Sequence, residues 1–166
     1  MNKILVSACL LGQPVRYDGR SLSVDHQILN EWTEKNIIVS VCPEVMAGMS
    51  TPRPPAEIVK GDGSQVLSLD SKVQTQGGID VSDYFIEGAK IALNLCIKHN
   101  IKIAILSESS PSCGSSSIYD GHFNRTKISG AGVTTTLLRQ NNIVVFNQYQ
   151  LEAAQKMMNE VISTSL

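Results

Sequence analysis

A chain of 166 residues, 42% hydrophobic and 17% charged, is long enough to form one compact domain with a sizeable core. Its formal net charge of -1 excludes the strongly basic surface with which proteins wrap a nucleic-acid backbone. We therefore expect a single domain over residues 1–166 that binds a small uncharged or anionic molecule and no nucleic acid.

The N-terminal residues do not resemble a signal peptide, because residues 1–14 reach polar residues, glycine and proline too early. No apolar stretch of the sequence approaches the ~20 residues that span a bilayer. We expect a cytoplasmic protein with no membrane partner. In that compartment the four cysteines indicate metal ligands or reactive thiols before structural disulfides.

Two strands and a helix open the chain. Short apolar runs over residues 4–8 and 37–41 predict buried strands, and apolar residues recur at helical spacing between them, over residues 24–36. We expect this helix to start near Asp25. Strand, helix and strand in this order form a βαβ unit, the building block of a parallel sheet.

Residues 43–78 are punctuated by prolines and glycines, which predicts an excursion loop over the sheet edge. Within it, residues 66–69 indicate one short strand or hairpin. Apolar residues at helical spacing over residues 80–100 then predict the longest helix, and residues 103–106 predict a third strand. The pattern of strand, helix and strand thus resumes after the excursion.

A Gly/Ser-rich turn region follows, and Gly130-Ala131-Gly132 then leads into another predicted helix. Residues 143–146 predict a fourth strand, and residues 149–163 predict a C-terminal helix. This order of elements predicts an α/β fold, a Rossmann-like three-layer α/β/α sandwich with a mainly parallel sheet of four to five strands.

Three of the four cysteines follow predicted strands. Cys9, Cys42 and Cys113 each come soon after a short apolar run, and the ends of parallel strands meet at one edge of a sheet. We expect their thiols to converge there. None belongs to a CxxC pair, so the three suit an iron-sulfur cluster with one open iron or a three-ligand catalytic zinc. Cys96, on the apolar face of a predicted helix, is expected in the core.

Seven short motifs around these cysteines stand in the same order as in a known family. They are Ser7-Ala8-Cys9-Leu10-Leu11-Gly12, Arg16-Tyr17-Asp18-Gly19, Cys42-Pro43-Glu44-Val45, Pro52-Arg53-Pro54-Pro55, Ser110-Pro111-Ser112-Cys113-Gly114, Ile118-Tyr119-Asp120-Gly121 and Gly130-Ala131-Gly132-Val133-Thr134. Through these motifs, residues 3–147 closely resemble the thiouracil desulfidase family, formerly a domain of unknown function. Only the C-terminal helix lies outside the resemblance.

The resemblance implies an enzyme with a 4Fe-4S cluster held by Cys9, Cys42 and Cys113. The fourth iron would take the sulfur of a thiolated pyrimidine, which leaves as sulfide, while water supplies the oxygen of the new carbonyl. 2-Thiouracil would then become uracil with no net redox change. An undercoordinated iron is a thiophilic Lewis acid and suits this reaction.

Such a reaction needs an acid/base group beside the cluster. Glu44, two residues after Cys42, is the candidate for proton transfer. Ser110, three residues before Cys113, is its expected partner, as a hydrogen-bond donor or proton shuttle. From local sequence alone, Glu44 is equally well a solvated loop carboxylate and Ser110 a turn residue.

Three further residues are expected to bind the substrate. Arg16 and Arg53 are cations near the motifs, suited to orienting a pyrimidine carbonyl or to neutralising cluster charge. The alternative for Arg53, about as well supported, is an ion pair with Glu57 or a cap on the loop. Tyr17 would wall the pocket, although an Asp-Gly turn explains its motif equally well.

One position departs from the family pattern, since Ser107 stands where a lysine is expected after the third strand. If that lysine helps to bind substrate, this member prefers another thiolated compound or binds thiouracil weakly. Two other classes of function are open. One is a non-catalytic iron-sulfur or metal-binding protein built on the same cysteines, and the other is a thiol-based sulfur carrier with a low-pKa cysteine and no metal.

Overall fold

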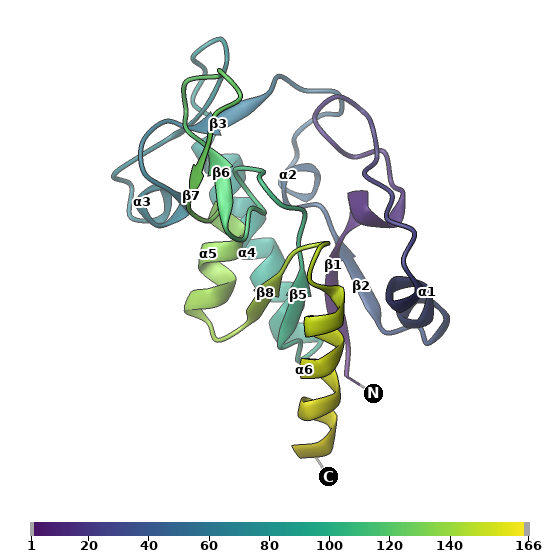
Figure 1. The fold of residues 1–166 in the computed structure, drawn as a ribbon. Helices are drawn as coiled ribbons and strands as arrows, with labels where there is room; N and C mark the ends of the chain where they lie inside the picture. Colours follow the sequence, from purple (N-terminus) through teal and green to yellow (C-terminus); the bar gives the residue numbers. More distant parts are fainter. Residues whose placement is uncertain (1, 165–166) are drawn as a thin grey trace.

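The centre of the molecule is a four-stranded parallel sheet, seen in a computed structural model that describes residues 2–164 (Figure 1). Its strands are β1 (Ile4–Ser7), β2 (Ile38–Val41), β5 (Ile103–Ile105) and β8 (Val144–Phe146). They lie in the order β2-β1-β5-β8, and every neighbouring pair is parallel. The sheet has four strands, as the sequence predicts.

Helices cover both faces of this sheet, two on each. They are α1 (Gln27–Glu34) and α6 (Leu151–Thr164) on one face, and α4 (Ser82–Lys98) and α5 (Val133–Gln140) on the other. This arrangement confirms the predicted Rossmann-like three-layer sandwich. No helix in the described part of the chain is long and apolar enough to cross a membrane.

Strand β1 shows why the strands are continuous apolar runs. Ile4 and Val6 pack against α1 and α6, whereas Leu5 packs against α4 and α5. Successive side chains of a strand point to opposite faces, so a sheet covered on both faces needs apolar residues at every position. All three side chains are fully buried.

Two of the predicted helices, α1 and α4, form close to where the sequence places them. Helix α1 begins at Gln27 rather than near Asp25, because the His26 ring nitrogen Nδ1 accepts a hydrogen bond from the Ile28 N–H at 3.1 Å and caps the helix. Helix α4 is the longest, with 17 residues, and it buries Cys96 against the sheet, as expected.

The predicted excursion over residues 43–78 contains regular structure. It holds α2 (Pro43–Met46), β3 (Ala56–Ile58), α3 (Gly63–Leu67) and β4 (Val73–Thr75). The prediction of a strand or hairpin at residues 66–69 is wrong, because α3 occupies residues 66 and 67. A capping box starts this helix: Asp62 Oδ1 accepts from the Ser64 N–H at 3.0 Å, and Gln65 Oε1 accepts from the Asp62 N–H at 2.8 Å.

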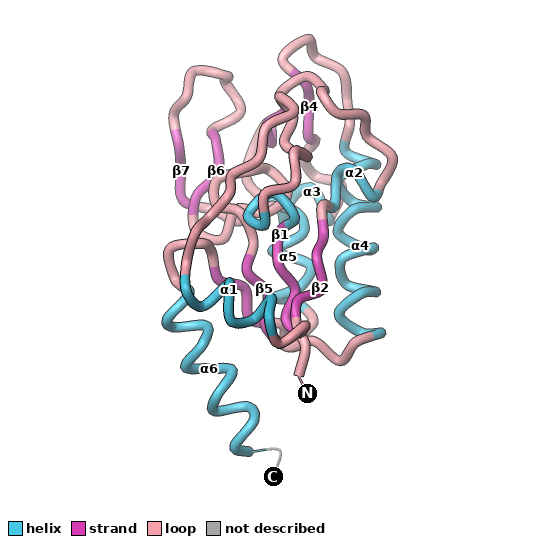
Figure 2. Tube along the Cα trace, turned by 90° about the vertical axis from the view of Figure 1, so that its right-hand side faces the viewer, coloured by secondary structure: helices cyan, strands magenta, loops and turns pink. Residues whose placement is uncertain are grey.

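The region after Cys113 is not only a turn. It contains an antiparallel hairpin of β6 (Ser117–Tyr119) and β7 (Lys127–Ser129). This hairpin and the antiparallel pair β3–β4 lie beyond the carboxyl ends of the parallel strands (Figures 1 and 2). Ile58 of β3 and Ile118 of β6 share one buried cluster with Phe85 of α4. The two small sheets therefore form a wall above the strand ends.

Gly88 of α4 allows that helix to approach α2, the helix that follows Cys42. A Cβ atom at Gly88 would lie 2.5 Å from the Pro43 carbonyl oxygen and 2.8 Å from its carbonyl carbon. In a free helix, alanine is more stable than glycine by about 0.5–1 kcal/mol. At this contact we expect Gly88→Ala to destabilise the protein by about 1–3 kcal/mol in urea denaturation, because the backbone of α2 must move.

Gly77→Ala is the matched control for this prediction. Its added Cβ would meet nothing closer than Thr75 Oγ1 at 3.8 Å, and Gly77 has no positive φ. We expect it to leave the free energy of unfolding within about 0.5 kcal/mol of the wild-type value. A Gly88→Ala variant as stable as the wild-type protein would contradict the close approach of α4 and α2.

Candidate active site

Three cysteines meet at the carboxyl ends of neighbouring strands. Cys9 lies in the 3-10 turn η1 (Ala8–Leu11) directly after β1, and Cys42 follows β2 at the start of α2. Cys113 lies in the loop after β5. Because β1 pairs in parallel with both β2 and β5, these ends share one edge of the sheet. All three cysteines line one cavity of about 870 Å³, as the sequence predicts.

The three thiols affect one another electrostatically. Burial raises the pKa of Cys9 and of Cys42, and burial raises the pKa of Cys113 to about 12. Charge on Cys9 or Cys42 adds to the rise in the pKa of Cys113. All four cysteines are free. Because the pKa values of Cys9, Cys42 and Cys113 are raised, these three thiols are protonated at neutral pH in the metal-free protein. They must release protons when they bind metal.

The donor set suits a cluster better than a single ion. Among residues 2–164, no three histidine, cysteine, aspartate or glutamate side chains come close enough together to hold one metal ion. A mononuclear zinc site needs its ligands around one point, whereas the thiolates of an iron-sulfur cluster each bind a different iron. Three thiols that line one cavity can each bind a different iron of such a cluster. The cavity is also within the range of about 300–1,000 Å³ for small-molecule and cofactor sites.

Glu44 is held beside the thiols by an ion pair with Arg53. Arg53 Nε donates to Glu44 Oε2 at 2.8 Å, and Arg53 Nη2 lies 2.7 Å from the same oxygen. The Arg53 side chain is 5% exposed and the Glu44 side chain is 16% exposed, so the pair is well shielded from water. The Glu44 charge raises the pKa of both Cys42 and Cys113, which places this carboxylate within electrostatic reach of two thiols.

The remaining N–H groups of Arg53 donate to the protein. Nη1 donates to the Ser50 carbonyl oxygen at 3.3 Å and to Thr51 Oγ1 at 3.1 Å, and Nη2 donates to the Val15 carbonyl oxygen at 3.0 Å. With the two contacts to Glu44, all five guanidinium N–H groups have acceptors. The alternative ion pair with Glu57 does not form. These contacts hold the Arg53 guanidinium and the Glu44 carboxylate in one place.

Arg16 and Tyr17 stand on the loop that Arg53 holds in place. The Arg53 N–H donates to the Tyr17 carbonyl oxygen at 2.7 Å. Both side chains line the cavity, and the Tyr17 side chain is 42% exposed. Arg16 is half-buried and forms no ion pair within the described residues, and its charge partly offsets the rise that burial causes in the pKa of Cys9. A cation without a carboxylate partner therefore lies close to the first thiol.

The loop before Cys113 contributes three serines to the cavity lining, Ser107, Ser109 and Ser110. Ser110 Oγ accepts a hydrogen bond from the Cys113 N–H at 2.7 Å. Its own hydroxyl hydrogen is left to donate elsewhere. Ser107, which stands where a lysine is expected, lines the cavity with Cys9, where burial raises the pKa of the thiol and Ser107 only partly offsets that rise. Ser107 therefore puts a neutral donor on this part of the cavity wall.

Sequence reasoning missed Glu108, which organises the Cys113 loop. Its Oε1 accepts from the Ser109 N–H at 3.0 Å and the Ser115 N–H at 2.8 Å, and its Oε2 accepts from Asn147 Nδ2 at 2.6 Å. Burial would raise the pKa of Glu108, but hydrogen bonds from the Ser115 hydroxyl and from backbone N–H groups lower it to about 2. The only sequence signal was one carboxylate within a serine-rich run.

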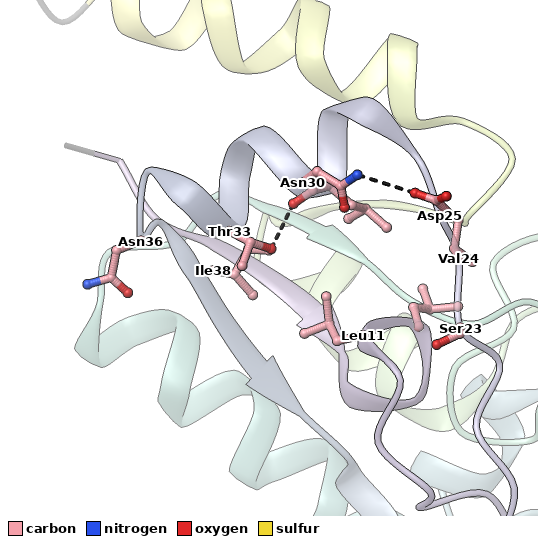
Figure 3. Close-up of a pocket in the computed structure, with 10 residues that line it drawn as sticks. Leu11, Ser23, Val24, Asp25, Asn30, Thr33, Asn36 and Ile38 are labelled. Atoms are coloured by element: carbon pink, nitrogen blue, oxygen red, sulfur yellow. Dashed lines mark hydrogen bonds between the residues drawn. The ribbon is translucent and has the colours of Figure 1, made fainter.

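A second cavity, of about 540 Å³, lies against α1 and the edge strand β2 (Figure 3). Asp25 is the charged residue in its lining, and its Oδ1 accepts from Asn30 Nδ2 at 3.3 Å. No cysteine or basic side chain lines this cavity. The cavity that contains the three thiols is therefore the candidate active site.

Comparisons with known proteins agree with the geometry. The family model described as 2-thiouracil desulfurase matches residues 4–150. The uncharacterized protein YbbK of Bacillus subtilis (strain 168) is 43% identical over 148 residues, which cover 89% of this chain and 97% of that protein. The solved structure of the 4Fe-4S-dependent thiouracil desulfidase TudS matches with a TM-score of 0.88 and 43% sequence identity, over 96% of this chain and 99% of that one.

The role of Glu108 predicts a pH-dependent stability. At pH 7 we expect Glu108→Gln to destabilise the protein by about 1–3 kcal/mol, because an amide NH₂ faces donors where a carboxylate oxygen accepted them. Folding depresses the pKa of Glu108 from 4.5 to about 2. The stability that the Glu108 carboxylate contributes is therefore complete above pH 4.5 and is lost as the pH falls towards 2.

Urea denaturation of both proteins between pH 2 and pH 7 tests this prediction. The stability difference between wild type and Glu108→Gln should shrink steadily below pH 4.5. Glu34→Gln, at an exposed position of α1, serves as control and should differ little from wild type across the range. A difference that stays constant down to pH 2 would contradict the assigned role of Glu108.

Proposed function

Because the chain belongs to the 2-thiouracil desulfurase family, we propose that it is a 4Fe-4S-dependent desulfidase for a thiolated pyrimidine such as 2-thiouracil. One 2-thiouracil and one water would give uracil and hydrogen sulfide, with no net change in oxidation state. The observation that carries the proposal is the single cavity in which three thiols meet a fixed carboxylate. The name of the structural relative TudS supports both the cofactor and the reaction.

Cys9, Cys42 and Cys113 would hold three irons of the cluster as thiolates. When bound, the cluster supplies an iron with an open position, a Lewis acid with high affinity for sulfur. The half-buried Arg16 offsets the negative charge that three thiolates bring into the cavity.

Glu44 would carry the protons of the reaction. Its Oε2 is fixed by Arg53, and no hydrogen bond from the described part of the chain reaches its Oε1. This free oxygen can take a proton from the attacking water and return it to the departing sulfur. Because Arg53 fixes the side chain, the carboxylate keeps one orientation through both transfers.

Ser110 and Tyr17 would help to hold the pyrimidine. The oxygen of Ser110 already accepts from the Cys113 N–H, so its hydroxyl hydrogen is free to donate to a substrate heteroatom. Tyr17 offers an aromatic face at the exposed side of the cavity, against which a flat ring can pack. Both roles rest on the position of these residues in the cavity lining.

The substrate is a small molecule in this proposal, and the setting is cytoplasmic, which the four free cysteines support. A thiol-based sulfur carrier needs a cysteine with a lowered pKa, whereas burial raises the pKa of Cys9, Cys42 and Cys113. A non-catalytic cluster carrier has no need for a carboxylate fixed beside the thiols. These observations favour the desulfidase over both alternatives.

Glu44→Gln tests the proposal directly. In anaerobically reconstituted protein, the variant should keep the iron and acid-labile sulfide content of wild type and release sulfide from 2-thiouracil about 100- to 10,000-fold more slowly. Glu87→Gln, at an exposed position of α4, is the control and should behave like wild type. Full activity in Glu44→Gln would remove Glu44 from the mechanism, and a cluster-loaded wild type without turnover on thiolated pyrimidines would refute the proposed function.

Arg53→Lys separates the positioning of Glu44 from the binding of substrate. Lysine keeps the positive charge but loses the planar set of five donors, so Glu44 would no longer be held in one orientation. We expect kcat to fall about 10-fold or more while KM stays unchanged, in steady-state assays of sulfide release. A rise in KM with unchanged kcat would instead assign Arg53 to substrate binding.

A further inference from the structure

Glu57 is a second buried carboxylate in the wall of the thiol cavity. It stands in the middle of β3, its exposure is 8%, and it lines the same cavity as Cys9, Cys42 and Cys113. A carboxylate so far from bulk water is costly unless its charge is paired or hydrogen-bonded. Its hydrogen bonds therefore indicate what the residue is for.

One oxygen of Glu57 is satisfied by the protein. Oε1 accepts from the Gly121 N–H at 2.9 Å and from the Phe123 N–H at 3.3 Å, both in the turn of the β6–β7 hairpin. Gly121 has a φ of +91°, and a Cβ there would lie 2.5 Å from the Ile58 carbonyl oxygen. A glycine is thus required for the turn to approach β3 and fix the carboxylate.

The other oxygen has no partner in the described part of the chain. No hydrogen bond reaches Glu57 Oε2, and the ion pairs among residues 2–164 are Asp18–Arg20, His26–Glu152 and Glu44–Arg53. Every described side-chain nitrogen or oxygen that is sealed from solvent has a hydrogen-bond partner. Because Glu57 Oε2 has no such partner, it must be in contact with open space. For a buried residue that lines the cavity, that open space is the cavity.

We infer that Glu57 Oε2 accepts a hydrogen bond from a ring N–H of the substrate, which makes Glu57 a specificity-determining residue. The inference rests on the proposed function and extends it to the substrate's ring. 2-Thiouracil has an N–H on each side of its thiocarbonyl carbon, and an ionised carboxylate only accepts hydrogen bonds. A charge-assisted N–H to carboxylate bond is among the stronger hydrogen bonds in proteins. Glu57 therefore selects pyrimidines whose matching ring nitrogen carries hydrogen.

Glu57→Gln tests this role with little disturbance of the fold. The amide oxygen can accept from the Gly121 and Phe123 N–H groups, and these two donors orient the amide so that its NH₂ group takes the place of Oε2. A donor then faces the substrate donor. In cluster-loaded protein we expect kcat/KM for 2-thiouracil to fall about 10- to 100-fold and its Kd to rise by a similar factor, with unchanged iron content and thermal midpoint.

Methylated substrates show whether the lost contact is the ring N–H. Wild type should discriminate about 10- to 100-fold against one of 1-methyl-2-thiouracil and 3-methyl-2-thiouracil. For that compound, Glu57→Gln should cause no further loss, because the hydrogen bond is already missing. Glu87→Gln serves as the exposed control and should match wild type on all three compounds.

Equal kcat/KM and Kd for wild type and Glu57→Gln on 2-thiouracil would overturn the inference, and so would the same proportional loss on all three compounds. The binding measurement separates this failure from failure of the proposed function. If wild type binds 2-thiouracil at least 10-fold more tightly than Glu57→Gln but releases no sulfide, the role of Glu57 stands and the desulfidase proposal fails. If cluster-loaded wild type does not bind 2-thiouracil, both fail.

Discussion

The parallel pairing of β1 with both β2 and β5 is the constraint on which the candidate site depends. It sets the carboxyl ends of three strands side by side, and Cys9, Cys42 and Cys113 follow those ends. A shift of one residue in a strand register would move its side chains to the opposite face of the sheet. Apolar residues buried on both faces of β1 fix that register, so core packing and the meeting of the three thiols have a common cause.

Above the strand ends, three carboxylates are held by three different means. Arg53 pairs with Glu44, backbone N–H groups of the β6–β7 turn bind Glu57, and a serine-rich loop with Asn147 surrounds Glu108. In Glu44 and Glu57, protein donors reach one carboxylate oxygen and leave the other without a described partner. In Glu108 both oxygens are used, which fits a residue that shapes the loop rather than one that meets substrate.

The layers of the fold and the convergence of the cysteines follow from local patterns: apolar runs predict the strands, and the topology of parallel sheets aligns their ends. Long-range contacts do not show in such patterns. The Arg53–Glu44 pair depends on how the loop at residues 50–55 folds back over α2, and the only ion pair that local sequence suggested for Arg53 was with Glu57. The short helix at Gly63–Leu67 was missed because its capping box outweighs the strand propensity of its apolar residues.

We propose that the thiols of Cys9, Cys42 and Cys113 hold the 4Fe-4S cluster. Iron and acid-labile sulfide should be measured per chain after anaerobic reconstitution of wild type and of four single Cys→Ser variants, at Cys9, Cys42, Cys96 and Cys113. We expect about four iron and four sulfide per chain for wild type and for the Cys96 variant, whose thiol lies in the core, and a marked loss for the other three. Equal cluster content in all five proteins, or no iron in wild type, would contradict it.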